Sequence, residues 1–298
     1  MIKPIICVVA LLTSFATTAQ QAGSDIWLGK LNDHGNEKAT IQIAEWTQIT
    51  DEPLYHNQPY FSEDSKSLYY TAASTSGQTD LFQFELKSQK HSNLTQSDTS
   101  EYSPTPMPNA KGISGIWVDE AGKQWLQQWS FTGERQSTLL AVEPIGYHVW
   151  VSPDEVLVFV LGEGEQPVHT LQRHDVTEVA AAKMIDQHIG ASLWAIPPHS
   201  GKFSYSKRVE GQHWLMAYHS DTDQVEQLVK IPKDTDYYAW TPNGIAVIGS
   251  QEPKLLAWSP ESGVDWVDFV AAPSECKRGI SRLSFSDDGQ YLAIVCNR

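Results

Sequence analysis

Polar and aromatic side chains recur along this chain about every 45 residues, in short apolar segments that each end in a polar turn. One recurring position holds Gln58, Ser103, His148, Leu193, Tyr237 and Arg282. Amides, hydroxyls, an imidazole and a guanidinium recognise ligands through hydrogen bonds and charge. A set of this kind indicates binding, provided that the fold brings its members together.

The segments around these residues define a repeat. They read "NQPYFSEDSK", "YSPTPMPNAK", "YHVWVSPDEV", "SLWAIPPHSG", "DYYAWTPNGI" and "SRLSFSDDGQ", and their second residues are separated by 45, 45, 45, 44 and 45 positions. Within each unit, short alternating or β-rich runs are broken by Asp, Asn, Gly, Ser and Pro, which is typical of strands and hairpins. Four strands in a unit of about 45 residues predict one blade of a β-propeller.

The predicted fold class is therefore all-β, a single six-bladed β-propeller spanning residues 20–298, with four-stranded antiparallel blades. Five blades are predicted at residues 55–98, 99–143, 144–185, 186–232 and 233–275. The sixth combines residues 276–298 with residues 24–50, where "DIWLGKL" and "ATIQIAEW" or "EWTQIT" supply the two missing strands. Such a 2+2 closure of N- and C-terminal strands leaves no broad unpaired sheet edge.

Two stretches carry a family resemblance. "QITDEPLYHNQPYFSEDSKSLYYTA" and "NLTQSDTSEYSPTPMPNAKGISGIWV" resemble the repeats of TolB-type six-bladed propellers, in which a Leu-Thr strand end leads to a Pro-aromatic-Ser-Pro-Asp-Gly turn. The resemblance covers roughly residues 24–298 and is weakest at the turns "SPDE" and "PPHSGK". TolB itself has an additional N-terminal α/β domain that this sequence does not show, so its cellular role does not carry over.

The first strand of each propeller blade lines the central channel, so the recurring positions predict a channel mouth. The candidate ligand-binding residues are Tyr147, His148, Asp236, Tyr237 and Arg282, with His56, Glu101 and Tyr102 at the rim. Arg282 and Asp236 suit an anionic and a cationic group respectively, or each other. The alternative is that all these side chains bond to neighbouring strands and channel waters, and only hold the ring together.

A metal site is a further alternative. Six-bladed lactonase-type propellers hold calcium in the channel, and Glu101, Asp236, Asn57 and Gln58 offer oxygen ligands here. His56 and His148 with one carboxylate would suit zinc. These residues lie at differing depths and on only some blades, so we expect no cofactor.

Motifs for covalent catalysis are missing from the sequence. It contains no Gly-x-Ser-x-Gly elbow, no phosphate-binding glycine-rich loop and no dinucleotide fingerprint. We therefore expect a non-enzymatic binding or protein-interaction module whose partner is a protein or a small molecule. The alternative is a metal-dependent hydrolase or lactonase that uses the same channel. Trp150, Trp194 and Trp240 fall within first strands, where packing between blades is expected.

The N-terminus predicts export. Residues 1–19 combine Lys3, an apolar run and small residues before Gln20, as in a cleaved signal peptide. Removing Lys3 changes the formal net charge from −15 to −16. An acidic protein disfavours nucleic acid, and no later run is long enough to span a membrane. A periplasmic or secreted location is expected.

Two cysteines follow the predicted signal peptide, Cys276 and Cys296. A regular hairpin centred on "SDDGQ" pairs Phe285 with Tyr291 and Cys296 with Ile280. A disulfide between the cysteines then requires the chain before Ile280 to curl back, because the two Cα atoms must come within about 7 Å. The sequence is compatible with either a disulfide or two free thiols at these positions.

Overall fold

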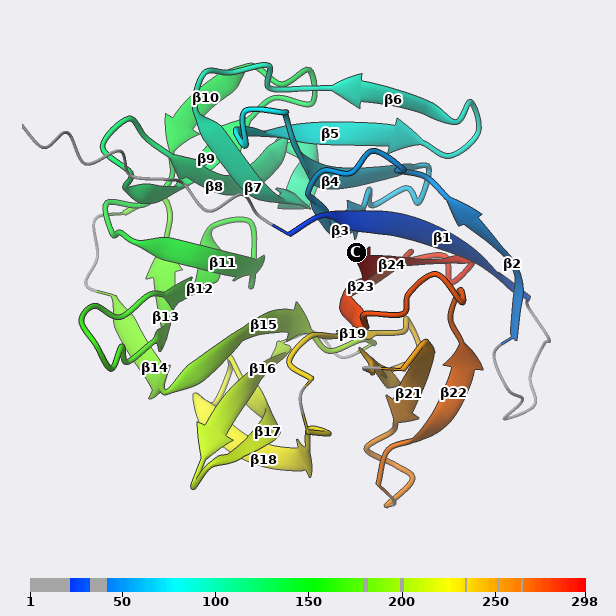
Figure 1. Ribbon diagram of the computed structural model, residues 1–298. Helices are drawn as coiled ribbons and strands as arrows, with labels where there is room; N and C mark the ends of the chain where they lie inside the picture. Colours follow the sequence, from blue (N-terminus) through cyan, green and yellow to red (C-terminus); the bar gives the residue numbers. More distant parts are fainter. Residues whose placement is uncertain are drawn as a thin grey trace, which may run out of the picture.

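The chain forms six four-stranded antiparallel sheets arranged around a central axis (Figure 1). The computed structural model describes residues 22–32, 42–178, 182–198, 201–233, 235–250, 252–263 and 265–298. The six-bladed, all-β fold expected from the repeat is confirmed. The predicted signal peptide, residues 1–19, lies outside the described residues. Within the ranges given above, no helix is long and apolar enough to cross a membrane.

Each blade is numbered in chain order, and its strands run outward from the channel. Blade 1 contains β3 (His56–Phe61), β4 (Ser67–Ala73), β5 (Thr79–Glu85) and β6 (Lys90–Asn93). Blade 2 contains β7 (Ser100–Pro106), β8 (Ile113–Val118), β9 (Gln124–Trp129) and β10 (Arg135–Thr138). Blade 3 contains β11 (Ile145–Trp150), β12 (Glu155–Val160), β13 (Thr170–Asp175) and β14 (Lys183–Gln187). Blade 4 contains β15 (Ile189–Ala195), β16 (Lys202–Val209), β17 (Gln212–His219) and β18 (Gln224–Lys230). Blade 5 contains β19 (Tyr238–Trp240), β20 (Ala246–Gly249), β21 (Lys254–Trp258) and β22 (Val267–Ala271). Blade 6 contains β23 (Ile280–Phe285), β24 (Tyr291–Asn297), β1 (Ser24–Asn32) and β2 (Gln42–Gln48).

Blade 6 closes the ring by joining the two ends of the chain. Its strand order is β2-β1-β24-β23, and β1 pairs with β24 so that Asp25 faces Cys296 and Trp27 faces Ile294. In Figure 1, blue β1 lies beside red β24. The expected 2+2 closure is thus present, and both ladder edges that an open ring would expose are paired.

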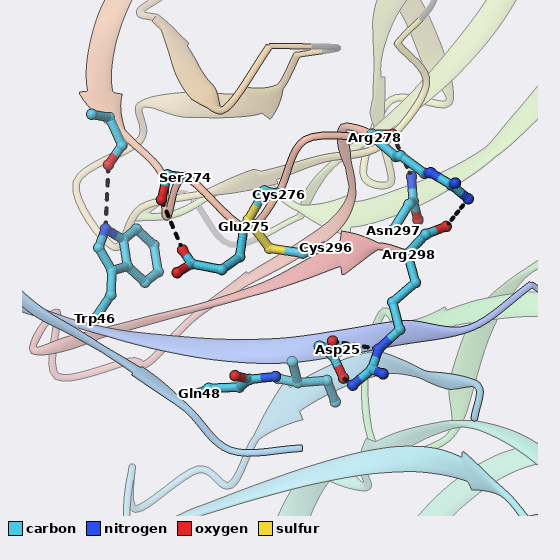
Figure 2. The surroundings of a disulfide bond; sticks show 12 residues. Asp25, Trp46, Gln48, Ser274, Glu275, Cys276, Arg278, Cys296, Asn297 and Arg298 are labelled. Carbon is cyan, nitrogen blue, oxygen red and sulfur yellow. Dashed lines mark hydrogen bonds and ion pairs between the residues drawn. A yellow bond between two sulfur atoms is a disulfide. The ribbon is translucent and has the colours of Figure 1, made fainter. Parts of the chain in front are cut away.

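Side-chain contacts reinforce this closure (Figure 2). A disulfide joins Cys276 to Cys296, whose Cα atoms are 4.7 Å apart. The Arg298 guanidinium donates two hydrogen bonds to the Asp25 carboxylate, at 2.6 and 2.7 Å. The turn at residues 273–279 carries Cys276 back toward β24, since its amide donates to the carbonyl of Pro273 at 3.0 Å. This is the curl of the chain that a bridge requires.

The last hairpin differs from the predicted register at one end. Cys296 faces Ile280 as expected, but Phe285 faces Leu292 rather than Tyr291. The turn contains one more residue than a regular hairpin would need, and a bulge between Ile280 and Arg282 restores the register beyond it. The two irregularities compensate, because each shifts the ladder by one residue.

The core lies between the blades, and the middle strands show why the sequence folds this way. Strand β12, "EVLVFV", is buried on both faces apart from its first residue. Its Val156, Val158 and Val160 pack toward blade 2, whereas Leu157 and Phe159 pack toward blade 4. Alternate side chains of one strand thereby enter two different interfaces, so an almost continuous apolar run is required.

Candidate binding site in the channel

The pairing of each first hairpin identifies the side chains that face the channel. The last paired residue of the first strand is Phe61, Pro106, Trp150, Ala195, Trp240 or Phe285 in blades 1 to 6. Counting back three residues from each gives one structural ring: Gln58, Ser103, Tyr147, Ser192, Tyr237 and Arg282. We call this the upper ring, because it lies toward the mouth at which the first strands begin.

The upper ring corrects the predicted position in blades 3 and 4. The repeat aligned His148 and Leu193 with Gln58, whereas the structure places Tyr147 and Ser192 there. The alignment matched Val151 with Phe61, but β11 already ends at Trp150 and Val151 belongs to the turn. Since side chains alternate along a strand, a slip of one residue assigns the wrong face.

Arg282 and Tyr147 meet across the channel, from opposite blades 6 and 3. Arg282 Nη2 donates a hydrogen bond of 2.6 Å to the Tyr147 hydroxyl. The guanidinium carbon lies 3.7 Å from the ring centroid of Tyr237 and 4.7 Å from that of Tyr147. Such stacking of a cation on aromatic faces is attractive, and it fixes the guanidinium plane.

Tyr55, which directly precedes β3, completes this group. Burial raises the pKa of Tyr55 and of Tyr237, although the positive charge of Arg282 opposes both shifts. Both phenols therefore remain protonated at neutral pH, and a protonated phenol can donate a hydrogen bond. Tyr55, Tyr147, Tyr237 and Arg282 are each partly exposed, so solvent reaches them. We call these four residues the tyrosine–arginine cluster.

A second ring lies two residues further along the first strands. It contains Tyr60, Thr105, Val149, Trp194, Ala239 and Ser284. Here blades 1 and 4 meet across the channel, because Tyr60 and Trp194 stack with ring centroids 5.4 Å apart and planes 15° apart. This contact is largely apolar, and we call it the Tyr60–Trp194 stack.

A cavity of about 70 Å³ lies between the two rings. All six residues of the upper ring line it, together with Tyr60, Thr105 and Trp194 of the second ring. Tyr147, Tyr237 and Arg282 of the tyrosine–arginine cluster line the cavity from the upper ring, and Tyr60 and Trp194 line it from the second ring. The channel is therefore divided, with polar recognition groups toward one mouth and an aromatic barrier beyond them.

His148 lines the cavity beside Tyr147, but its imidazole forms a hydrogen bond between blades. Its Nε2 is 2.6 Å from Ser114 Oγ, which also accepts a hydrogen bond of 2.9 Å from Trp150 Nε1. Burial lowers the pKa of His148 to about 3, so the imidazole is neutral at physiological pH. Blade 5 repeats the arrangement, since Tyr238 Oη and Trp240 Nε1 both donate to Ser204 Oγ. The histidine thus has a packing role that a tyrosine fills elsewhere.

The other predicted residues make their contacts outside the cavity. The buried His56 places Nδ1 3.1 Å from the Ser24 carbonyl oxygen, at the closure of the ring. The exposed Asp236 pairs with His213 Nδ1 at 2.6 Å and not with Arg282. Tyr102 packs against the core between blades 2 and 3. None of these three lines the cavity.

Glu101 is buried near the start of β7, next to the loop that joins blades 1 and 2. Its Oε1 accepts hydrogen bonds from Ser97 Oγ at 2.6 Å and Thr99 Oγ1 at 2.9 Å. Burial raises the pKa of this carboxyl, and the hydroxyl donors oppose the shift. Glu101 serves the loop and does not reach the channel cavity.

The proposed metal ligands do not converge. Asn57 Oδ1 accepts the amide hydrogen of Gln58 at 2.8 Å, and Gln58 Oε1 accepts that of Ser103 at 3.1 Å. Both oxygens are therefore used, while Glu101 and Asp236 lie elsewhere. Across the described parts of the chain, no group of three or more His, Cys, Asp or Glu side chains is arranged to hold a metal ion. Neither the calcium nor the zinc set fits.

The sequence did not predict a position in or beside the channel for Tyr55, Tyr60 and Trp194. Tyr60 and Trp194 lie two residues past the upper ring, so the period of a strand identifies them once the register is known. The sequence predicts interblade packing for Trp150, Trp194 and Trp240. Trp194 also stacks on Tyr60 in the channel, whereas Trp150 and Trp240 lie in the interblade clusters. Tyr55 precedes its strand, where no periodic signal applies.

Fold and channel define a six-bladed β-propeller with a partitioned, aromatic-lined channel. Its architecture is similar to that of the "putative TolB" of Agrobacterium tumefaciens (TM-score 0.67, 14% identity, 93% of this chain and 99% of that one). It is also similar to TolB from Acinetobacter baumannii (TM-score 0.57, 14% identity, 92% of this chain and 63% of that one). A gluconolactonase from Xanthomonas campestris is comparably similar (TM-score 0.65, 11% identity, 93% and 97%).

These similarities establish the fold alone, since TolB proteins and a lactonase share it. The resemblance to TolB-type propellers is confirmed at that level. No protein-family model matches the chain, and the comparison with curated proteins gives no match. The residues that line the channel are therefore the evidence that bears on function.

Proposed function

We propose that this protein is an exported, non-enzymatic binding or protein-interaction module that receives a protein segment or a small molecule at the upper mouth of its channel. The observation that carries the proposal is the cavity itself. Six side chains from six blades converge on it, and the tyrosine–arginine cluster supplies donors and aromatic faces there. A concave site with a few placed polar groups among aromatics is the usual form of a ligand site.

Export is supported by two independent features. Residues 1–19 have the composition of a signal peptide. The disulfide between Cys276 and Cys296 is of a kind that persists in oxidising compartments such as the periplasm or the extracellular space. The periplasmic or secreted location belongs to this proposal.

A binding role without chemistry is supported by the groups that line the cavity. Proton transfer needs a positioned acid or base that titrates near neutral pH. Arg282 stays charged, burial raises the pKa of Tyr237 so that its phenol stays protonated, and burial lowers the pKa of His148 to about 3 so that its imidazole is neutral near pH 7. The alternative, a metal-dependent hydrolase or lactonase, would need oxygen ligands that the described residues hold apart.

Channel binding is tested by filling the cavity. Ser103 lines it, and among the described atoms its buried Oγ has no hydrogen-bond partner, so Ser103→Phe adds bulk without breaking such a bond. Ser137→Phe is the matched control, an exposed serine on β10 of the same blade. Tagged proteins are used for affinity capture from periplasmic extract, followed by native mass spectrometry.

We expect the native protein and Ser137→Phe to retain the same bound molecule or partner, and Ser103→Phe to lose it. Circular dichroism and thermal melting establish that both variants are folded. Capture that survives Ser103→Phe unchanged would exclude the channel as the site. Turnover of a lactone by the native protein that depends on an added divalent metal would favour the enzymatic alternative.

A further inference from the structure

We propose that the group recognised at the upper mouth is a single carboxylate, bound by Arg282. The inference rests on the proposed channel-binding function and adds the chemistry of the ligand. Its starting point is a missing partner. Among the described residues no carboxylate lies within ion-pair distance of Arg282, although this guanidinium is partly buried.

Arg173 shows what a partly buried arginine otherwise does in this protein. Its Nε and Nη2 donate to the two carboxylate oxygens of Glu155 at 3.0 and 2.8 Å. A guanidinium removed from water is costly unless its charge and donors are matched. Arg282 has instead one hydrogen bond to a neutral hydroxyl and two aromatic neighbours. It lacks the counter-ion that Arg173 has.

The geometry favours a planar, bidentate anion. A guanidinium carries five N–H donors, and the bond to Tyr147 uses one. Stacking on Tyr237 covers a face of the group, which leaves the donors along its edge. A carboxylate matches two parallel N–H donors of such an edge.

The charge of the site favours a monoanion. Arg282 is the cation of the tyrosine–arginine cluster, so a carboxylate neutralises it, whereas phosphate dianion would leave one negative charge uncompensated in a partly desolvated site. The formal net charge of the whole chain, −15, opposes a second negative charge as well. Local charge and overall charge thus select the same class.

The cavity limits what carries the carboxylate. Its volume of about 70 Å³ accommodates a small group, and the Tyr60–Trp194 stack crosses the channel beyond it. The ligand therefore inserts a carboxylate on a narrow stem. A free small acid, an acidic side chain and a polypeptide C-terminus all present this chemistry.

Isothermal titration calorimetry at low salt distinguishes these sources. The probes are acetate, gluconate, acetyl-pentaalanine with a free C-terminal carboxylate, its C-terminal amide, and inorganic phosphate. We expect at least one carboxylate probe to bind with 1:1 stoichiometry, and the peptide amide and phosphate to bind at least about tenfold more weakly, since hydrogen bonds to charged groups contribute that much. Preference for acetate or gluconate identifies a free acid, and preference for the peptide acid identifies a polypeptide.

Arg282→Gln should weaken carboxylate binding by at least about tenfold, and Arg282→Lys should do so less, because it keeps the charge but loses the fork. The matched control is Arg135→Gln, which removes another arginine stacked on an aromatic ring, Trp117 at 4.4 Å, outside the channel. This control should bind within about twofold of the native protein, as expected for independent sites.

Three results would overturn the carboxylate assignment: no binding of any carboxylate probe, tighter binding of phosphate, or equal binding by Arg282→Gln. If these occur while Ser103→Phe still abolishes capture, the channel-binding function stands and only the ligand class is wrong. If Ser103→Phe retains capture, the proposed function fails first.

Discussion

Tyr147 and His148 are adjacent in β11 but belong to two different regions of the molecule. Tyr147 is on the channel face, where it meets Arg282 of the opposite blade. His148 is on the interblade face, where Ser114 and Trp150 form a buried group with it. The Arg282 guanidinium on the channel face has a hydrogen bond to Tyr147 and no carboxylate partner among the described residues, whereas the buried donors between blades bond to neighbouring strands. In this propeller the face of the strand, rather than the residue type, decides whether a side chain meets the opposite blade or packs against the neighbouring one.

The largest expected effect concerns acid stability and the interblade face. The pKa of His148 is about 3 in the folded protein and 6.5 in the unfolded chain, so the unfolded chain binds more protons between these values. This contribution to stability is complete above pH 6.5 and is lost as the pH falls. His148→Gln removes this titration, so between pH 7 and pH 4 the free energy of unfolding of the native protein should fall by about 3 kcal/mol more than that of the variant.

Urea unfolding of both proteins at several pH values measures this difference in pH dependence. Parallel stability curves for the native protein and His148→Gln would mean that His148 does not titrate with a lowered pKa. The environment of His148 would then resemble that of a channel-face residue, and the distinction between the faces of Tyr147 and His148 would be wrong.

The second prediction concerns Trp194, a channel-face residue that also contributes to packing. Trp194 faces the channel, yet it stacks on Tyr60 and packs against the interblade clusters of blades 4 to 6. Trp194→Ala should lower the free energy of unfolding by about 2–3 kcal/mol, less than for a fully buried tryptophan because Trp194 is partly exposed. A loss below about 1 kcal/mol by urea unfolding would show that the stack is not a structural barrier.

The third prediction compares two serines that have the same role. Ser114 accepts hydrogen bonds from Trp150 and lies beside His148, and Ser204 accepts from Tyr238 and Trp240. Ser114→Ala and Ser204→Ala should each cost about 2 kcal/mol, because buried donors lose their acceptor. The exposed Ser137→Ala should cost less than about 0.5 kcal/mol. Thermal and urea unfolding that rank Ser137 with the other two would contradict the assigned role.

The smallest effect on stability is expected at the tyrosine–arginine cluster. Arg282→Gln and Tyr147→Phe break one hydrogen bond to a partly exposed group, so each should change the free energy of unfolding by less than about 1 kcal/mol. Both should nevertheless weaken carboxylate binding in calorimetry. A variant that binds normally but unfolds easily would place Arg282 among the packing residues.

The repeat in the sequence was sufficient to predict the fold. Runs of period two, turn residues and a spacing near 45 specify four-stranded blades, and six blades follow from the length. The closure in blade 6 was predictable for the same reason, because β1 and β2 are strands without another partner. These features depend on local pattern, which the sequence contains in full.

The site was predictable only in part. Tyr147, Tyr237 and Arg282 were among the candidates, and the structure brings these three together. His148 was also among the candidates and lines the cavity, but its imidazole bonds to Ser114 between blades. The partners of Glu101, His56 and Asp236 come from loops and neighbouring blades that no repeat describes. A count of polar residues cannot distinguish these environments.

The sequence by itself determined that six similar blades surround a channel whose first strands carry mixed polar and aromatic residues. Only the tertiary structure decided which of those residues face each other. Tyr147 and Arg282 are 135 positions apart, and Tyr60 and Trp194 are on opposite blades. Their contacts exist because the ring closes, and the face each side chain presents depends on turn lengths and bulges that shift the register by one residue.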